Sequence, residues 1–151
     1  MIITVAGTDY MDIRRAQPAD ADALLGFWAE AGASLSVTDE VPYLRRAIEN
    51  PAAALLIAEA DGKLVGSILR TFDGWRGNVY RLVVHPRYRR QGIARVLVRD
   101  IERVFVAWGV RRVTVLVEVD RPWATQFWRA VGYPRDEHIA RHLGIIETST
   151  S

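Results

Sequence analysis

The chain has 151 residues and a formal net charge of +2, with half of its residues apolar and a quarter charged. This length suits a single domain with a substantial core. No apolar run approaches the ~20 residues of a membrane helix, and the absence of cysteine excludes a disulfide framework, a thiolate metal site and a cysteine nucleophile. The start of the chain lacks the basic residues of a signal peptide, so we expect a cytoplasmic protein.

Arginine accounts for nineteen of the twenty basic residues, and nine arginines lie between residues 81 and 112 beside only two acidic residues. Such a cluster suits an anionic partner. A nucleic-acid surface would interleave exposed aromatic side chains or carry a recognisable reader motif, and neither is evident here. The cluster therefore favours a small ligand that carries phosphate, with nucleic acid as the weaker alternative.

The first half of the chain is predicted to contain two helices and a β-hairpin. Residues 1–10 are predicted to be an extension before a short first strand at 12–14. Apolar residues at helical spacing predict a helix introduced by Pro18, with a second helix over 39–49. The period then changes to that of strands over 55–60 and 64–69, which flank the two-residue turn Asp61-Gly62.

The second half is predicted to add strands, two helices and a polar tail. The expected strands cover residues 79–84, 113–119 and, at one edge, 139–145. The expected helices cover about 89–108, closed by Gly109, and a segment from Pro122 to Gly132. The fold class is thus α/β (α+β), with a mixed, mostly antiparallel sheet of six to seven strands flanked by about four helices. We expect one domain over 11–146 and a flexible tail over 147–151.

The most informative stretch runs from Val83 to Ala94, Val-Val-His-Pro-Arg-Tyr-Arg-Arg-Gln-Gly-Ile-Ala. Two β-branched residues end a strand, His85-Pro86 stops it, and a basic turn with Gly92 opens a long amphipathic helix. Free backbone N–H groups, the positive end of the helix dipole and nearby guanidinium groups together form an anion site. The expected ligand group is a phosphate or pyrophosphate.

This order of elements resembles the GNAT superfamily of acyl-CoA-dependent N-acetyltransferases. The signature of that family, Arg or Gln, two residues, Gly, one residue, then Gly or Ala, stands here at Arg89–Ala94. The block from Ala124 to Tyr133 is similar to the last helix of the family and its Gly-aromatic ending. Asp73-Gly74-Trp75-Arg76-Gly77 further resembles the small bacterial YpeA-like subgroup. The resemblance covers about residues 11–145.

The resemblance implies acetyl-CoA as the co-substrate, without a metal. Its pyrophosphate would meet the N–H groups of 91–95, and its pantetheine arm would pair with 82–84 where that strand and 113–118 splay apart. A backbone N–H near Val84 would hold the developing oxyanion, an effect of roughly 3–4 kcal/mol in other enzymes. The residues implied in cofactor binding are Leu82, Val83, Val84, Arg89, Arg90, Gln91, Gly92, Ile93, Ala94, Arg95, Arg121 and Phe127.

Three positions depart from the pattern of the family and leave the acid and base open. A Tyr that often serves as general acid is Trp128 here, whose indole is only a donor. A Glu often found two residues before Leu82 is Tyr80, and an Asn at the start of the last helix is Arg121. Glu118 is the first candidate base, although an ion pair with a nearby arginine explains it equally well. Tyr80 is the candidate acid; Tyr133 and solvent are alternatives.

The implied reaction is direct acetyl transfer to a primary amine of a small molecule or of a protein or peptide. Three acidic residues in expected loops, Asp39, Glu40 and Asp73, are candidates to bind a cationic amine, and Trp28 or Trp75 to line its pocket. His85 is expected at the end of a strand. A non-catalytic acyl-CoA-binding module on the same fold is the alternative, and a homodimer is compatible with the sequence. His138 and His142 lack a third ligand for a metal.

Overall fold

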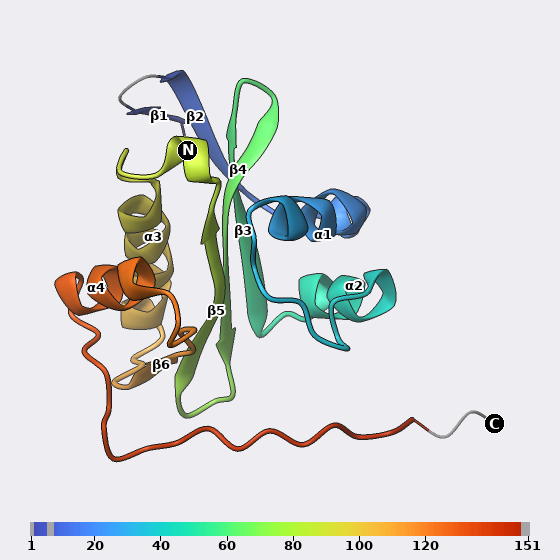
Figure 1. Cartoon of the computed structure of the whole chain (residues 1–151), viewed down its shortest axis with the longest axis vertical. Coiled ribbons are helices and arrows are strands. Elements are labelled where there is room, and N and C mark those ends of the chain that lie inside the picture. Colours follow the sequence, from blue (N-terminus) through green and yellow to red (C-terminus); the bar gives the residue numbers. More distant parts are fainter. Residues whose placement is uncertain (1, 6–7, 149–151) are drawn as a thin grey trace. The chain divides into compact units, whose positions relative to one another are not determined.

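The structure is a computed structural model that describes the backbone of residues 2–5 and 8–148 and the side chains from residue 11 to 148. The chain divides into two compact units, Met1–Leu116 and Val117–Ser151. The first unit holds the sheet and three of the α-helices, and the second holds one helix and the C-terminal segment (Figure 1).

A six-stranded sheet forms the centre of the first unit, with its strands in sequence order. Neighbouring strands are antiparallel except for the last pair, which is parallel, so the sheet is mixed as predicted. The strands are β1 (Ile2–Val5), β2 (Thr8–Arg15), β3 (Ala53–Ala60), β4 (Lys63–Phe72), β5 (Gly77–Val84) and β6 (Val113–Val115). The sheet thus reaches into the segment that was predicted to be an N-terminal extension, of which residues 1, 6 and 7 lie outside the described residues.

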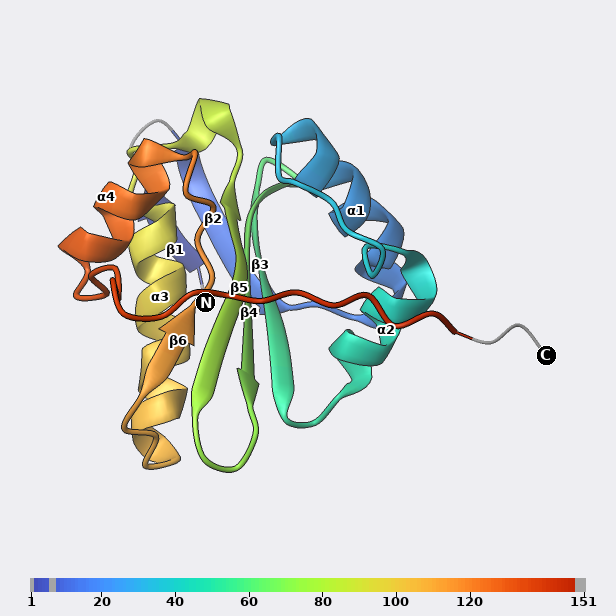
Figure 2. The same cartoon turned by 60° about the horizontal axis from the view of Figure 1, so that its bottom comes forward.

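Helices cover both faces of this sheet. A short 3₁₀ turn, η1 (Pro18–Asp20), leads into α1 (Ala21–Glu30), and α2 (Val41–Glu49) follows on the same face. The long helix α3 (Ile93–Ala107) lies on the opposite face (Figure 2). Both faces must be covered by apolar side chains because the side chains of a strand alternate between the two faces; β3 is buried along most of its length and β4 in its middle part.

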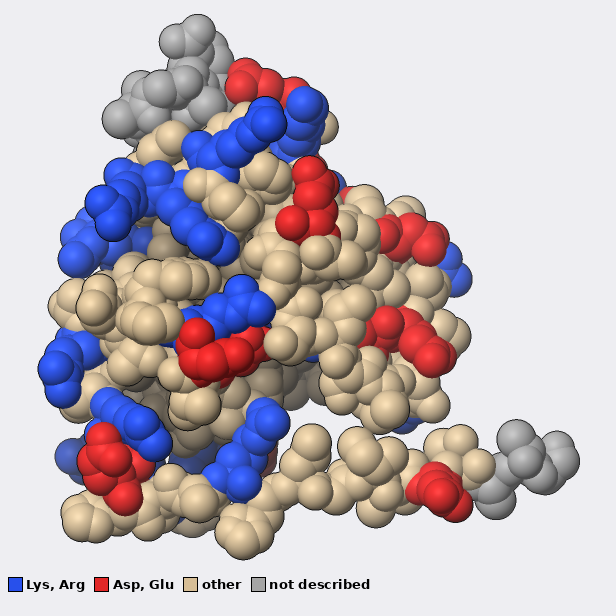
Figure 3. Space-filling view, in the orientation of Figure 1, with Lys and Arg blue, Asp and Glu red and all other residues tan. Residues whose placement is uncertain are grey.

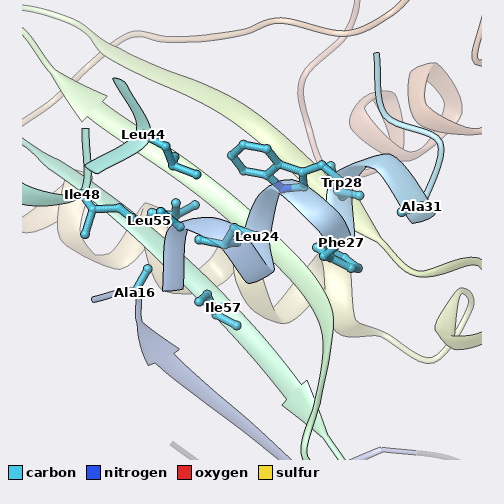
Figure 4. Packing of buried hydrophobic residues seen from close by; sticks show 11 residues of the cluster. Ala16, Leu24, Phe27, Trp28, Ala31, Leu44, Ile48, Leu55 and Ile57 are labelled. Carbon is cyan, nitrogen blue, oxygen red and sulfur yellow. The ribbon is translucent and has the colours of Figure 1, made fainter. Parts of the chain in front are cut away.

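The core on the α1 and α2 face is a single cluster of buried side chains (Figure 4). Trp28 is its largest member and is almost fully buried. Both helices and two strands contribute, so the cluster fixes α1 and α2 on β3 and on the end of β5. Its members are Ala16, Ala21, Leu24, Phe27, Trp28, Ala31, Leu44, Ile48, Leu55, Ile57 and Val83.

On the other face, two glycines allow α3 to lie close to the sheet. A Cβ at Gly66 would stand 3.0 Å from Ile93 Cγ2, and a Cβ at Gly77 would stand 2.8 Å from the ring of Phe105. A side chain at position 66 or 77 would therefore overlap α3, because protein interiors are packed as densely as organic crystals. These contacts fix both ends of α3, and therefore its N-terminus, relative to β4 and β5.

The predicted hairpin turn is confirmed. Asp61 and Gly62 both adopt positive φ, +52° and +74°, and join β3 to β4. Positive φ at both central residues is the geometry of the two-residue turn that Asp-Gly favours. The predicted helix introduced by Pro18 and those over 39–49 and about 89–108 are present as α1, α2 and α3, but α3 begins later because the turn through residue 92 is not helical.

The second unit contains α4 (Pro122–Ala130), with Pro122 in the first turn as predicted. Gly132 has a φ of +99°, and Tyr133 N donates to Trp128 O at 2.7 Å, which ends the helix. None of the helices in the described part of the chain is long and apolar enough to cross a membrane.

Two predictions about this region are wrong. The predicted edge strand over 139–145 is absent, since residues 134–148 form neither helix nor strand; residues 149–151 lie outside the described part. Ile139 and Leu143 are each 68% exposed, and an extended segment becomes a strand only where a neighbouring backbone accepts its hydrogen bonds. The predicted strand over 113–119 stops at Val115, so Glu118 does not lie on it.

Candidate functional site

One edge of β5 opens where its parallel neighbour ends. β6 pairs with Gly77–Val79 only, and Leu116 N donates the last bond to Val79 O at 3.3 Å. Beyond this point, the described residues provide no strand partner for 80–84 on this side. Five residues of strand span about 16 Å, and the backbone on this side, which has no strand partner, can pair with an extended ligand.

A bulge interrupts β5 on the side of β4. Ser67 faces Val83 and Leu69 faces Tyr80, so Arg81 and Leu82 together stand opposite a single residue of β4. Arg81 has a φ of +53°, in the left-handed region that L-residues with side chains seldom adopt. The bulge therefore reorients the backbone of β5 just before the stretch 82–84.

The segment after β5 turns tightly into α3. His85 precedes the 3₁₀ turn η2 (Pro86–Tyr88), and His85 Nδ1 accepts a hydrogen bond from Arg87 N at 3.2 Å. Arg90 and Gly92 then adopt positive φ, +61° and +86°. At Gly92 a Cβ would meet no atom within 4 Å, so its left-handed backbone is what favours glycine there, and the surrounding space is open.

The N-terminus of α3 faces this turn without a cap. The N-cap residue is Gly92, which has no side chain to cap the helix, and Val96 N donates to Gly92 O at 3.1 Å. The first N–H groups of a helix have no carbonyl partner within it, and the helix dipole places positive potential there. This end of α3 can therefore bind an anionic group, and the buried side chain of Ile93 anchors it to the core.

Basic side chains surround the turn. Arg89 Nε donates to Val84 O at 3.3 Å, so its half-buried side chain folds back onto the end of β5. Arg90 and Arg95 are exposed. Figure 3 shows blue side chains gathered over η2 and the start of α3. In addition, Gln91 Oε1 is buried without a hydrogen-bond partner, which leaves an acceptor inside the turn.

Several of the residues predicted to bind the cofactor can contact a ligand only through their backbone. Val83 and Val84 are buried, and Val83 belongs to the cluster beneath α1 and α2. The side chain of Ile93 is also buried, whereas Leu82 and Ala94 are half-buried. The structure therefore places 82–84 and 89–95 in one continuous path from the open edge of β5 to the N-terminus of α3.

Tyr80 lies within the open edge. It is half-buried and stands directly opposite Leu69, which packs against the cluster beneath α1 and α2. Residues directly opposite each other in an antiparallel pair share a face, so Tyr80 belongs to the face that carries those helices. His85 sits at the end of the strand, as predicted, and its Nε2 lies 3.4 Å from Glu30 Oε1. Because Nδ1 accepts, the neutral ring carries its proton on Nε2.

The remaining predicted residues belong to the second unit. Glu118 Oε2 forms an ion pair with Arg121 Nε at 2.8 Å, one of the pairings that the sequence left open. The pair is partly exposed, and such pairs contribute about 0–1 kcal/mol to stability. Separation of the Glu118 carboxylate from Arg121 therefore costs little free energy. Phe127 packs edge-to-face on Trp128, and Trp128 packs likewise on Tyr133.

Two of the acidic residues considered for amine binding are engaged within the fold. Asp39 forms an ion pair with Arg81. Asp73 Oδ1 accepts bonds from the N–H groups of Trp75 and Arg76 at 2.8 and 2.7 Å, and these bonds lower the pKa of its carboxyl. Glu40 is exposed. Trp28 is core, whereas Trp75 is 71% exposed. Over residues 2–5 and 8–148, no group of three His, Cys, Asp or Glu side chains could hold a metal ion.

A buried polar network near the bulge was not predicted. Trp28 Nε1 donates to Ser67 Oγ at 2.9 Å, and Ser67 Oγ donates to Arg81 O at 2.9 Å. The only sequence signal is a serine within an otherwise apolar strand, which by itself does not identify its partners.

Solved structures share this fold at low sequence identity. A predicted acetyltransferase from Clostridium acetobutylicum, solved with acetyl-CoA, has a TM-score of 0.73 and 13% identity, over 88% of this chain and 96% of its own. An aminoglycoside acetyltransferase from an uncultured soil metagenomic sample, solved with trehalose, has a TM-score of 0.73 and 17% identity, over 91% and 97%. A ribosomal-protein-alanine N-acetyltransferase from Brucella melitensis biovar Abortus 2308 has a TM-score of 0.68 and 18% identity, over 91% and 99%.

The family comparison agrees with the geometry. Residues 21–133 match the model of the Acetyltransferase (GNAT) family. This range includes the open edge of β5, the basic turn, α3 and α4. The chain belongs to the acetyltransferase (GNAT) family.

Proposed function

We propose that this protein is an acetyl-CoA-dependent N-acetyltransferase that transfers the acetyl group directly to a primary amine of a small molecule or of a protein or peptide. The observation that carries the proposal is the path from the open edge of β5 through the basic turn to the uncapped N-terminus of α3. Acetyl-CoA has the matching chemistry, since an extended arm with amide groups ends in a pyrophosphate.

In this proposal the pyrophosphate lies against the N–H groups of residues 91–95, with the charge of Arg89 and Arg90 beside it. The arm pairs with the backbone of 82–84, where only main-chain groups are needed because Val83 and Val84 are buried. The same path explains why Gly92 stands in open space. Arg121 and Phe127 stay proposed cofactor-binding residues, as the resemblance to the family implies.

The reaction forms one C–N bond and breaks one C–S bond. The amine nitrogen attacks the thioester carbonyl carbon, and a backbone N–H near Val84 stabilises the oxyanion. The amine loses a proton to a base, and the departing thiolate takes one from an acid or from solvent. We propose Glu118 as the base once it leaves Arg121, and Tyr80 on the open edge of β5 as the acid.

The alternative is a non-catalytic acyl-CoA-binding module on the same fold. The observation that favours it is the indole of Trp128, which stands where many members of the family carry a tyrosine hydroxyl and is held between Phe127 and Tyr133. We also propose membership of the YpeA-like subgroup, supported by the resemblance of residues 73–77, and a cytoplasmic location, with which the lack of cysteine is compatible. Homodimer formation stays a prediction.

Thiol release from acetyl-CoA separates the two functions. The assay uses an aminoglycoside, a polyamine and a peptide with an N-terminal alanine as acceptors, because similar structures include enzymes named for aminoglycosides and for ribosomal-protein alanine. Amine-dependent release that falls by about 10²–10⁴ in Tyr80→Phe supports the enzyme and the role of Tyr80 as acid. Release that Tyr80→Phe leaves unchanged supports the enzyme but contradicts that role.

Thermal shift gives the complementary result. The binding module is supported if acetyl-CoA raises the melting temperature, inorganic phosphate does not, and no amine causes thiol release from acetyl-CoA. No shift with acetyl-CoA contradicts both functions.

A further inference from the structure

We propose that Arg81 is a positioning residue that couples the segment between α1 and α2, residues 31–40, to the bulge of β5 that lies before the thioester-binding stretch. This inference rests on the proposed function, because it concerns how acetyl-CoA is held. The contacts that carry it all lie within the first unit.

The backbone of Arg81 is in an unfavourable conformation that its side chain compensates. Its φ of +53° places a residue with a long side chain in the left-handed region, where Gly and Asn are the usual occupants. Asparagine or glycine would satisfy the backbone alone. An arginine at this position therefore indicates that the guanidinium is used.

The guanidinium of Arg81 binds the 31–40 segment at two points. Nη1 donates to Ser34 O at 2.7 Å, and Nη2 forms a hydrogen-bonded ion pair with Asp39 Oδ2. The side chain of Asp39 is only 7% exposed. The guanidinium also lies 5.0 Å from the centre of the Trp28 ring. A planar, forked cation is suited to holding a carboxylate, a carbonyl and an aromatic face at once.

The carbonyl of Arg81 is fixed from the opposite direction. It accepts the hydroxyl of Ser67, which itself accepts the indole N–H of Trp28, and that network is buried. Arg81 is thus held at its backbone by β4 and at its side chain by the segment. A shift of either partner would move the bulge and, through it, the backbone of 82–84.

The core holds the start of the segment, since Ala31 belongs to the buried cluster, Ala33 packs against it, and Ala33 N donates to Trp28 O at 2.9 Å. Ser36 N donates to Asp39 Oδ2 at 2.6 Å, so the carboxylate that binds Arg81 also closes a turn inside the segment. Between the two anchors, Leu35 and Val37 are 51% and 55% exposed. Arg81 therefore holds both ends of this tip, at Ser34 and Asp39, and we expect acetyl-CoA that orders the bulge to order the tip as well.

Hydrogen exchange at the amides of residues 35–38 measures this coupling, with acetyl-CoA binding followed by calorimetry on the same samples. In the wild type, acetyl-CoA is expected to slow exchange by at least about fivefold, the lower end of ordinary coupling between sites. In Arg81→Asn, which tolerates the left-handed backbone, acetyl-CoA should still bind through the turn and α3, but exchange should change by less than about twofold. Arg81→Lys should restore part of the effect because the charge returns.

Two further variants make the result decisive. Asp39→Asn removes the anion without touching the backbone of the bulge, and it should lose the coupling as Arg81→Asn does, even if the latter folds poorly. Arg103→Asn is the matched control, since Arg103 also pairs with an aspartate, at 3.3 Å, but on the exposed face of α3; it should keep the wild-type response.

The outcomes separate this inference from the proposed function. Absence of acetyl-CoA binding in the wild type overturns both. Binding in the wild type with equal slowing of exchange in Arg81→Asn and Asp39→Asn overturns the coupling alone.

Discussion

Arg89 Nε donates a hydrogen bond to the carbonyl oxygen of Val84, 3.3 Å away, and so holds a positive charge at the end of β5. The bond closes the basic turn on the strand whose edge is open. Arg89 thus stabilises the turn and places a positive charge beside the N-terminus of α3.

The first prediction follows from this double role. Arg89→Gln should weaken acetyl-CoA binding about tenfold or more, since hydrogen bonds to charged groups contribute about 1.5–3 kcal/mol. Arg99→Gln, at an exposed position on α3, should stay within about twofold of the wild type. Calorimetric titration measures both. Equal losses in the two variants would show that only the total charge matters.

Ser67→Ala should destabilise the fold by about 1–3 kcal/mol, because it leaves the buried indole N–H of Trp28 and the carbonyl of Arg81 without their partner. Thr114→Val, which removes an exposed hydroxyl from β6, should change stability by less than about 0.5 kcal/mol. Urea unfolding gives both values. A Ser67→Ala variant as stable as the wild type would mean that the network contributes nothing.

Stability should fall in acid partly through Asp20. Its carboxyl receives both Nη groups of Arg14 at 2.8 Å, and this pairing, aided by Gln17 N, lowers its pKa against the opposing effect of burial. A lowered pKa means that the stabilisation is fully present above the ordinary value of about 3.9 and disappears as pH falls through the folded-state value.

Asp20→Asn should therefore be less stable than the wild type near neutral pH, and the two should converge on acidification. Urea unfolding at several pH values measures the difference. Asp22→Asn, an exposed position of α1, serves as the control. A difference between Asp20→Asn and the wild type that stays constant down to about pH 2 would refute the role of this pair.

Arg70 is a buried cation whose guanidinium lacks a full set of partners. Arg70 is 7% exposed, and its Nη1 has no hydrogen bond. Its Cζ lies 4.6 Å from the centre of the Trp108 ring. Burial, helped by the charge of Arg15, lowers its pKa, while Asp100 opposes the shift.

Replacement of such a group by an apolar residue is often neutral or stabilising. The free energy of unfolding of Arg70→Met should therefore be no more than about 1 kcal/mol below that of the wild type, and it can be higher. Arg70→Lys keeps a buried charge but loses the planar stacking, so its free energy of unfolding should be lower. Denaturant midpoints decide the matter. Loss of more than about 2 kcal/mol in Arg70→Met would mean that its remaining contacts outweigh its desolvation.

The features that the sequence predicted well depend on neighbouring residues. Asp61-Gly62 forms the expected turn, and the basic turn through Gly92 leads into α3 as expected, because positive φ and helix starts are encoded within a few residues. The bulge at Arg81 was not predictable in this way. Its partner Asp39 lies 42 residues away in the chain, and nothing near Arg81 in the sequence indicates a left-handed backbone.

The shortened strand and the absent strand have a common cause. Alternating apolar residues suggested strands over 113–119 and 139–145, but the pattern does not say whether a neighbouring backbone is available to pair. β6 ends at Val115, and Glu118 is paired with Arg121 outside it. The β1 strand was missed for the complementary reason, since its four residues gain a partner only when the chain doubles back at β2.

The central claim is that acetyl-CoA binds where β5 runs into α3, and two glycines of α3 offer a matched test. Gly92 before its first turn and Gly109 after its last have φ of +86° and +70°, and a Cβ at either would meet no atom within 4 Å. Replacement by valine strains both backbones alike, at about 1–2 kcal/mol each.

Calorimetric titration of acetyl-CoA into the wild type, Gly92→Val and Gly109→Val is therefore the most direct measurement. We expect binding to the wild type and to Gly109→Val with similar affinity, and at least about a hundredfold loss in Gly92→Val, since the new side chain occupies the space before the N–H groups of α3. Equal affinity in the two variants, or no binding to the wild type, would contradict the claim.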